Sequence, residues 1–186
     1  MLGYAFCGSF CTHQRSLEEL QKLIDAGYDV LPIFSDSVWT TDTRFGTALA
    51  LKERVESICH KSVIHTVVDA EPIGPKTRLD ALIVCPCTGN TLAKLASGIT
   101  DTPVTMAAKA HLRQSRPLLI SLATNDAMSA NLKNISTMLE KKGVFFVPMK
   151  QDDCQKKPHS LVSEFEMIPE CLVSALNGKQ ERPLFI

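Results

Sequence analysis

The stretch DALIVCP, residues 80–86, is apolar from its second residue to its last, with no alternation of polar and apolar side chains. A strand with this pattern has both faces covered, as in a parallel sheet packed between helices. Five other short apolar runs alternate along the chain with segments whose apolar residues recur at helical spacing. They are GYAFC (3–7), DVLPIF (29–34), SVIHTVV (62–68), RPLLISLA (116–123) and VFFVP (144–148). The pattern predicts an α/β fold, a three-layer, doubly wound parallel sheet of the Rossmann or flavodoxin-like type.

The chain is expected to form a single domain over 1–186, because its length suits one core and it contains no linker, repeat or low-complexity block. Helical patterns follow the strands, among them GNTLAKLASGI (89–99), PVTMAAKAHLRQ (103–114) and AMSANLKNISTMLEKKG (127–143). The last segment is expected to be a helical tail at about 158–178, kinked or broken at Pro169.

Charge and composition exclude several classes of function. Lysine plus arginine equals aspartate plus glutamate, 20 each, so the net charge is zero and gives no broad attraction to nucleic acid or to an anionic membrane. No apolar run is long enough to span a bilayer, and the first residues lack a basic leader. Seven cysteines without an export signal indicate mainly reduced thiols, so we expect a cytoplasmic protein with no nucleic-acid or membrane partner.

Small polar residues follow the first two predicted strands. In a doubly wound sheet, ligands bind beyond the carboxyl ends of the strands, so these residues are candidates for a binding site. Gly8 and Ser9 precede a predicted helix, whose free amides attract a phosphate. Ser35 and Ser37 follow the second strand and are placed to bind the same anion. The alternative is that Gly8 and Ser9 simply cap the helix and that the polar loop after Ser35 is closed by a buried aromatic residue.

The segment after DALIVCP is the most unusual part of the chain. Thr88, Asn90 and Thr91 place small side chains and free amides at one helix start, a surface that suits a heteroaromatic ring with carbonyl groups at its edge. Lys94 lies one turn further on, and Asp101 is expected to cap the next helix.

Two residues after the fifth predicted strand, Asn125 and Met128, have two interpretations. Asn125 faces the same crevice with Met128 beside it, or Asn125 and Asp126 cap a helix and Met128 belongs to the core.

Four cysteines lie at predicted strand ends and raise the alternative of a metal site. They are Cys7, Cys11, Cys85 and Cys87. Four thiolates can hold zinc or an iron–sulfur cluster, but the spacings C-x3-C and C-x-C are not those of the usual metal-binding knuckles. We therefore predict no metal site and interpret these cysteines as small buried side chains. A single reactive thiol near a cofactor fits the pattern better than a metal cluster.

The segments GSFCT, PCTGNTLAKLASGITDTPVT and TNDAM resemble, in order and spacing, the flavoprotein family that includes flavin-containing cysteine decarboxylases and flavin prenyltransferases. This resemblance implies an FMN site. The matching positions are Gly8, Ser9 and Ser35 near the phosphate; Cys87, Thr88, Asn90 and Thr91 along the ring and ribityl chain; and Asn125 and Met128 in the motif after the fifth strand.

The chain also departs from that family. Leu122, Thr124 and Ser129 stand where the decarboxylases have proline, methionine and tryptophan, which argues against decarboxylase chemistry. The decarboxylases use a histidine near the third strand, and His65 lies roughly there as a weak candidate for a catalytic base. The alternative is that His65 is structural.

Within the family, TDTRFG, VVDAEPIGPK, ATNDAM and QDDCQKKP resemble the group of B subunits of dipicolinate synthases. That resemblance implies an oxidoreductase component that acts with a separate A subunit during sporulation. The pair would oxidise a dihydrodipicolinate-level precursor to dipicolinate, with FMN here and NADP on the partner. It also implies a homo-oligomer, a trimer or a multiple of trimers.

The implied substrate is a small dicarboxylate, so cationic side chains are expected to face it. The nearest candidates in sequence are Lys94, Lys109, His111 and Arg113. Two alternatives remain. The chain is a non-catalytic partner that stabilises or feeds the A subunit, or it is a stand-alone flavin-dependent decarboxylase or prenyltransferase.

Overall fold

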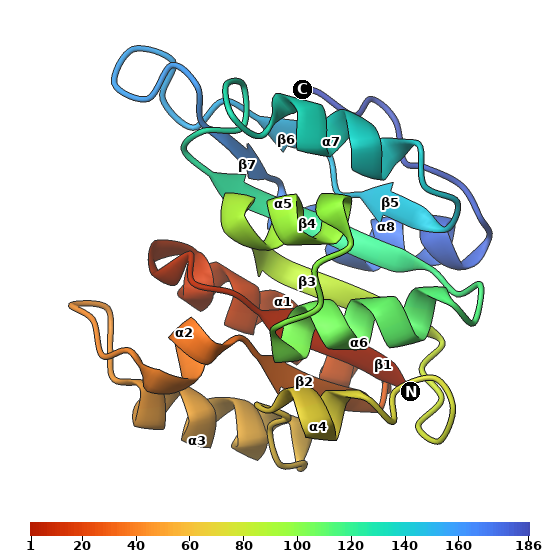
Figure 1. Ribbon diagram of the computed structural model, residues 1–186. Coiled ribbons are helices and arrows are strands. Elements are labelled where there is room, and N and C mark those ends of the chain that lie inside the picture. The colour runs from red at the N-terminus through yellow and green to blue at the C-terminus, as the bar shows by residue number, and fades with distance from the viewer.

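A seven-stranded sheet runs through the centre of the computed structural model, which describes all 186 residues (Figure 1). The strands are β1 (Leu2–Phe6), β2 (Val30–Phe34), β3 (Ala81–Cys87), β4 (Leu118–Thr124), β5 (Val144–Phe146), β6 (Met149–Lys150) and β7 (Leu161–Ser163). Their order is β2-β1-β3-β4-β7-β6, and β5 also pairs with β4. The pairs among β1 to β5 are parallel. The predicted doubly wound α/β fold is confirmed, with a sheet that is mostly parallel.

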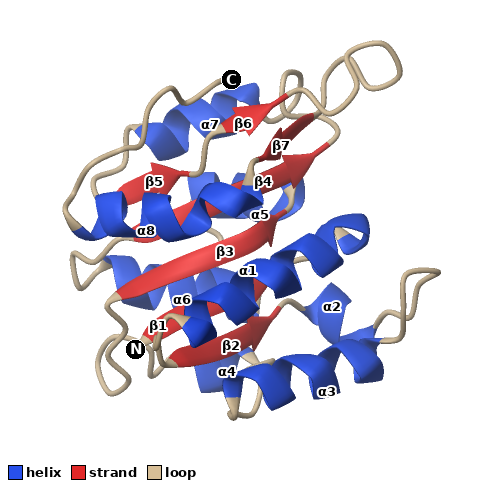
Figure 2. Cartoon of the chain, turned by 180° about the vertical axis from the view of Figure 1, so that it is seen from behind, coloured by secondary structure: helices blue, strands red, loops and turns tan.

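Helices cover both faces of the sheet (Figure 2). They are α1 (His13–Asp25), α2 (Asp36–Thr40), α3 (Ala48–Cys59), α4 (Val67–Ala70), α5 (Gly89–Ser97), α6 (Pro103–Leu112), α7 (Leu132–Leu139) and α8 (Ile168–Leu176), with short 3-10 turns at Phe10–Thr12 and Phe165–Met167. One core joins α1, α3 and α8 to Leu2, Tyr4 and Phe6 of β1. The other joins α4 to α7 to Ala5 and to the alternate residues of β3 and β4. Successive side chains of each strand thus enter opposite cores, as the unbroken apolar run of β3 requires.

The predicted strand at 62–68 is wrong. Only Ile64 pairs with the sheet, through a single parallel bridge to Ile33. From Val67 the chain turns into the short helix α4, because the Thr66 side chain caps it by accepting a hydrogen bond from the Asp69 amide at 3.0 Å. A local cap therefore outweighs the β-branched composition of this segment.

The tail predicted to be helical from about 158 begins with a strand instead. β7 pairs antiparallel with β4 and with β6, so the sheet is not wholly parallel. β6 and β7 are joined by the polar loop 151–160, and a hairpin of this kind needs no crossover helix. Helix α8 begins only at Ile168, with Pro169 in its first turn, where proline is well tolerated. No helix in the protein combines the length and the apolar character needed to cross a membrane.

Candidate functional site

A pocket of about 410 Å³ lies beyond the carboxyl ends of β1, β2 and β3, on the side to which the arrowheads point in Figure 2. We call it the strand-end pocket. Most of its lining residues are small or carry hydroxyl groups, and Phe10 is the only apolar side chain among them. The lining residues are Gly8, Phe10, Ser35, Asp36, Ser37, Thr88, Asn90, Thr91, Lys94 and Thr102. The strand order changes direction between β1 and β3, which is where flavodoxin-like sheets bind their ligands.

Close contacts hold the three strand ends together. A Cβ atom on Gly8 would lie 2.9 Å from Oγ of Ser37, so glycine lets the loop after β1 approach α2 this closely without moving that hydroxyl. The hydroxyls of Ser35 and Ser37 lie 3.0 Å apart. The Thr91 hydroxyl donates to the thiol of Cys7 at 3.3 Å, which ties α5 to the end of β1. The pocket is therefore built by segments that are distant in sequence.

Helix α5 presents its amino end to the strand-end pocket. The Thr88 hydroxyl accepts a hydrogen bond from the Thr91 amide at 3.3 Å and so caps the helix. As the first two residues of α5, Gly89 and Asn90 carry amides that have no acceptor within the helix. Free amides, several hydroxyls and one lysine are donors for a phosphate or for ring carbonyl groups. This donor set fits a phosphate-bearing flavin.

The charge of the strand-end pocket is nearly balanced. Nζ of Lys94 lies 2.8 and 2.9 Å from the two carboxylate oxygens of Asp101, and this contact lowers the pKa of Asp101. Asp101 therefore does not cap α6, contrary to our expectation. Thr102 caps α6 instead, in a capping box with Thr105. Asp36 adds a carboxylate to the pocket lining.

Five of the nine residues predicted to bind the cofactor line the strand-end pocket. They are Gly8, Ser35, Thr88, Asn90 and Thr91. Ser9 follows Gly8 directly, and its backbone carbonyl accepts a hydrogen bond from the Thr12 hydroxyl at 2.8 Å. Cys87 is fully buried in the core, so it supports the pocket from behind instead of lining it. Sequence reasoning did not select Phe10, Asp36 and Thr102 as site residues, because nothing in their local pattern distinguishes them from ordinary loop and cap residues.

Asn125 and Met128 lie outside the strand-end pocket. The Asn125 side chain is exposed, and Met128 lines a different hollow beside the 151–155 loop and the last two residues. Helix α7 begins only at Leu132, because the Asp126 carbonyl accepts hydrogen bonds from the amides of Ser129 and Asn131 in a turn.

The turn after β4 nevertheless contacts the start of α5. Oδ1 of Asp126 accepts hydrogen bonds from the Thr124 hydroxyl at 2.6 Å and from Nδ2 of Asn131 at 2.9 Å. This cluster packs against Gly89. Sequence reasoning considered Asp126 only as part of a helix cap with Asn125, and so missed its role as the centre of this cluster.

His65 lies beside the carboxyl end of β2 but does not line the strand-end pocket. Its ring stacks on the indole of Trp39, with centroids 3.6 Å apart and 14° between the planes. Its Nδ1 atom lies 3.4 Å from the carbonyl oxygen of Val63. The stacking gives His65 a structural role, and its role as a base stays a prediction.

The predicted cationic residues are divided between two edges of the sheet. Only Lys94 reaches the strand-end pocket. Lys109, His111 and Arg113 lie at the far end of α6, near the start of β4. There Nε2 of the fully buried His111 donates to the carbonyl oxygen of Pro117 at 2.9 Å, and burial lowers the pKa of His111. These three residues are therefore poorly placed to meet a ligand at the strand ends.

Three of the four cysteines at the strand ends are buried side chains. Cys7, Cys85 and Cys87 are buried, whereas Cys11 is exposed. Burial raises the pKa of both Cys7 and Cys85 to about 11, so neither is a thiolate at neutral pH. The structure has no group of three or more ligand-type side chains placed to hold a metal ion.

The sequence of the chain is similar to a family of known proteins and to one of its members over nearly its whole length. The family model described as Flavoprotein matches residues 4–177. The chain is 37% identical to the B subunit of dipicolinate synthase from Bacillus subtilis (strain 168) over 185 residues, covering all of this chain and 92% of that protein.

Solved structures of similar proteins have the same fold as this chain. The crystal structure of the dipicolinate synthase B subunit from Bacillus halodurans superposes with a TM-score of 0.91 at 39% identity, covering all of this chain and 95% of that one. The FMN-dependent cysteine decarboxylase SpaF superposes with a TM-score of 0.67 at 22% identity over 94% of this chain and 95% of its own, a likeness that extends to the fold alone. The chain therefore belongs to the Flavoprotein family.

Proposed function

We propose that this chain is the flavin-binding B subunit of a dipicolinate synthase. With a separate A subunit, it would oxidise a dihydrodipicolinate-level precursor to dipicolinate in the cytoplasm during sporulation. The observation that carries the proposal is the full-length likeness, at 37% identity, to the Bacillus subtilis B subunit. The strand-end pocket supports it, because its donors suit the cofactor class of the family.

FMN is the proposed cofactor, supported by the family and by the FMN dependence of its decarboxylase neighbour SpaF. In the proposed arrangement, the loop of Gly8 and Ser9 and the Ser35 hydroxyl hold the phosphate. Thr88, Asn90 and Thr91 hold the ring and the ribityl chain. A bound oxidised flavin supplies a hydride acceptor, which is the chemistry needed to aromatise a dihydropyridine ring.

The chain's own residues have three tasks in this proposal. The amides of Gly89 and Asn90 orient polar ligand edges at the amino end of α5. The hydroxyls of Ser35 and Ser37 donate to an anion from the β2 side. Lys94, held by Asp101, places one positive charge in the pocket. Together these groups bind and orient the ligand.

The assembly is also a proposal. The A subunit is the expected partner and the expected carrier of NADP. A homo-oligomer, a trimer or a multiple of trimers, is expected from the family resemblance. Sedimentation of the purified chain, alone and with its proposed partner, tests both expectations.

Reconstitution tests the function directly. Purified chain is titrated with FMN while the fluorescence of Trp39, the only tryptophan, is recorded. The A and B subunits are then combined with precursor and NADP, with and without FMN, and dipicolinate is measured by its absorbance. We expect quenching that saturates and dipicolinate formation that requires both this chain and FMN. Formation of dipicolinate in the absence of this chain would contradict the proposal.

Variants in the strand-end pocket sharpen this test. Ser35→Ala removes a hydroxyl donor, so we expect FMN affinity to fall about tenfold, equivalent to one hydrogen bond. The matched control is Ser97→Ala, an exposed serine near the end of α5 that should leave FMN affinity unchanged.

A second candidate function is that of a non-catalytic partner of the A subunit. It is favoured by Leu122, Thr124 and Ser129, which replace the residues that the decarboxylases have after the fifth strand. A colourless protein that binds no FMN yet still stimulates its partner would support it.

A further inference from the structure

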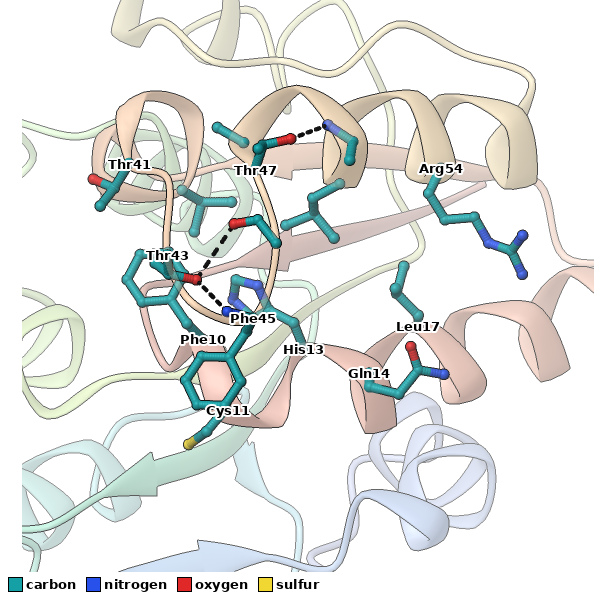
Figure 3. Close-up of a pocket in the computed structure, with 15 residues that line it drawn as sticks. Phe10, Cys11, His13, Gln14, Leu17, Thr41, Thr43, Phe45, Thr47 and Arg54 are labelled. Atoms are coloured by element: carbon teal, nitrogen blue, oxygen red, sulfur yellow. Dashed lines mark hydrogen bonds between the residues drawn. The ribbon is translucent and has the colours of Figure 1, made fainter.

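A second pocket, of about 290 Å³, lies between the start of α1, the start of α3 and the loop 41–47 (Figure 3). We call it the α1–α3 pocket. Its volume is at the small end of the range for small-molecule sites, so it suits a single substituted ring. Phe10 lines both this pocket and the strand-end pocket, so one side chain separates the two.

One end of the α1–α3 pocket is aromatic. Figure 3 shows Phe10 and Phe45 together at this end. Phe45 leaves 55% of its surface exposed beside Phe10. The two phenylalanines therefore offer aromatic surface that a flat apolar ring would cover.

The loop that carries Phe45 is held in shape by its own contacts. The Thr43 hydroxyl accepts a hydrogen bond from the Phe45 amide at 3.1 Å. Oδ1 of Asp42 accepts one from the Ala48 amide at 2.9 Å, which ties the loop to the start of α3. The Arg44 guanidinium lies over the Phe45 ring, 4.8 Å from its centroid. A wall that is already ordered costs a ligand little conformational entropy on binding.

The opposite end of the α1–α3 pocket carries a positive charge. Figure 3 shows Arg54 there. Arg54 makes no ion pair or hydrogen bond within the protein. Glu18 borders an adjoining hollow together with Arg54, but it accepts a hydrogen bond from Nε2 of Gln14 at 3.0 Å instead. The guanidinium is therefore available to a ligand.

Arg54 is also the only charged side chain in the pocket lining. No aspartate or glutamate lines the pocket, and burial lowers the pKa of His13, so its imidazole is neutral at pH 7. The strand-end pocket differs, because its Lys94 is already paired with Asp101. An unpaired guanidinium favours an anion, and a carboxylate matches its planar geometry.

The position of Phe10 separates this pocket from the proposed reaction. In the proposed cofactor arrangement, the loop of Gly8 and Ser9 holds the flavin phosphate, so the phosphate and not the flavin ring lies on the far side of Phe10. A ligand in the α1–α3 pocket would therefore take no part in hydride transfer.

We propose that the α1–α3 pocket is a separate binding site for a small aromatic carboxylate. The ring lies against Phe10 and Phe45, and the carboxylate pairs with Arg54. This inference goes beyond the proposed function, because it rests only on the shape and charge of the pocket.

Binding is tested on this chain alone, with benzoate as the probe. Selective ¹⁵N labelling of the eight phenylalanines allows each amide signal to be followed by NMR. We expect the signals of Phe10 and Phe45 to shift and to saturate with benzoate. The matched control is Phe185, which is 53% exposed and lines a different hollow, so its signal should not move. Benzamide, which has the same shape without the charge, should bind at least about tenfold more weakly.

Two arginine variants locate the carboxylate. Arg54→Gln should weaken benzoate binding by about tenfold or more, through the loss of a charge-assisted hydrogen bond. Arg78→Gln replaces another exposed arginine without an ion pair and should bind like the wild type. The spectrum of each variant without ligand shows whether its fold is intact.

Three results would overturn the proposal. Equal shifts of Phe45 and Phe185 would mean that benzoate merely adsorbs to exposed rings. Wild-type affinity in Arg54→Gln would remove the contact with the carboxylate, and equal affinity for benzoate and benzamide would remove the role of charge. Neither flavin nor the A subunit enters this experiment, so its failure would leave the proposed function standing, and failure of the reconstitution would leave this site standing.

Discussion

A Cβ atom on Gly89 would lie 2.7 Å from Oδ1 of Asp126, so the first residue of α5 packs directly against the carboxylate that follows β4. The same oxygen accepts hydrogen bonds from Thr124 and Asn131. A carboxylate is also favourable at the amino end of a helix. The turn after β4 and the helix that borders the strand-end pocket are therefore held as one unit.

The substitution Gly89→Ala should disturb this unit. Its methyl group would meet Asn131, Thr124 and Asp126 at 2.5 to 2.7 Å, so neighbouring side chains must move. We expect the free energy of unfolding in urea to fall by about 1–3 kcal/mol, as for other overpacked sites. Asn90→Ala is the control: Asn90 is exposed in the same turn, and its loss should change the stability by less than about 0.5 kcal/mol. Equal stability of the two variants would contradict this account of Gly89.

Asp126 should tolerate asparagine better than alanine. Asparagine keeps an acceptor oxygen for Thr124 and Asn131, whereas alanine leaves both donors without their partner. We expect Asp126→Ala to cost about 1–3 kcal/mol of unfolding free energy and Asp126→Asn clearly less. Hydrogen exchange of the peptide spanning 86–95 gives a second readout, since amides at the start of α5 should exchange faster in Asp126→Ala. The same exchange in both variants would show that the carboxylate does not hold α5.

The cysteines should fall into two reactivity classes. Cys11 and Cys154 are exposed, and the other five are buried. Burial raises the pKa of Cys59 and Cys171 to about 12, which further suppresses their thiolates. A thiol titration with Ellman's reagent should therefore find two fast cysteines in the folded protein and seven after denaturation. Three or more fast cysteines would contradict the burial described here.

The stability should decrease under mildly acidic conditions. Burial lowers the pKa of His13 and His111, so at pH values near and below 6.5 the unfolded chain binds more protons than the folded one. Their contribution is complete above the unfolded pKa and is lost as the pH falls towards the lower folded pKa. Urea denaturation at pH 7.5 and 5.5 measures the change.

Histidine variants assign that pH dependence. His111→Gln should reduce the loss of stability between the two pH values, because one of the two buried imidazoles no longer titrates. His159→Gln replaces an exposed histidine and should leave the loss unchanged. The opposite ranking of the two variants would refute the assignment.

The sequence predicts the sheet well where burial alone decides. The unbroken apolar run at 81–86 becomes β3, which is buried at every position. It predicts poorly where a local cap or turn competes with composition. Thr66 starts a helix inside a β-branched segment, and the turn at Asp126 delays α7 to Leu132.

The candidate site shows the same division. Thr88 and Ser35 line the strand-end pocket because they follow strands directly, so the topology alone placed them. His13 escaped notice because its place in a pocket depends on the packing of the loop 41–47, which no local pattern records. Of the two interpretations of Met128, the core one fits: Met128 packs against the core and lines the hollow beside the 151–155 loop, not the strand-end pocket.

Phe10 lines both the strand-end pocket and a second pocket, which lies between α1, α3 and the loop 41–47. If the occupant of one pocket shifts the ring of Phe10, it changes the free energy of binding in the other. Linkage makes such an effect reciprocal, so each ligand would alter the affinity for its neighbour by the same factor. A single phenyl ring can thereby make the two sites cooperative or mutually exclusive, without any movement of the sheet that carries them.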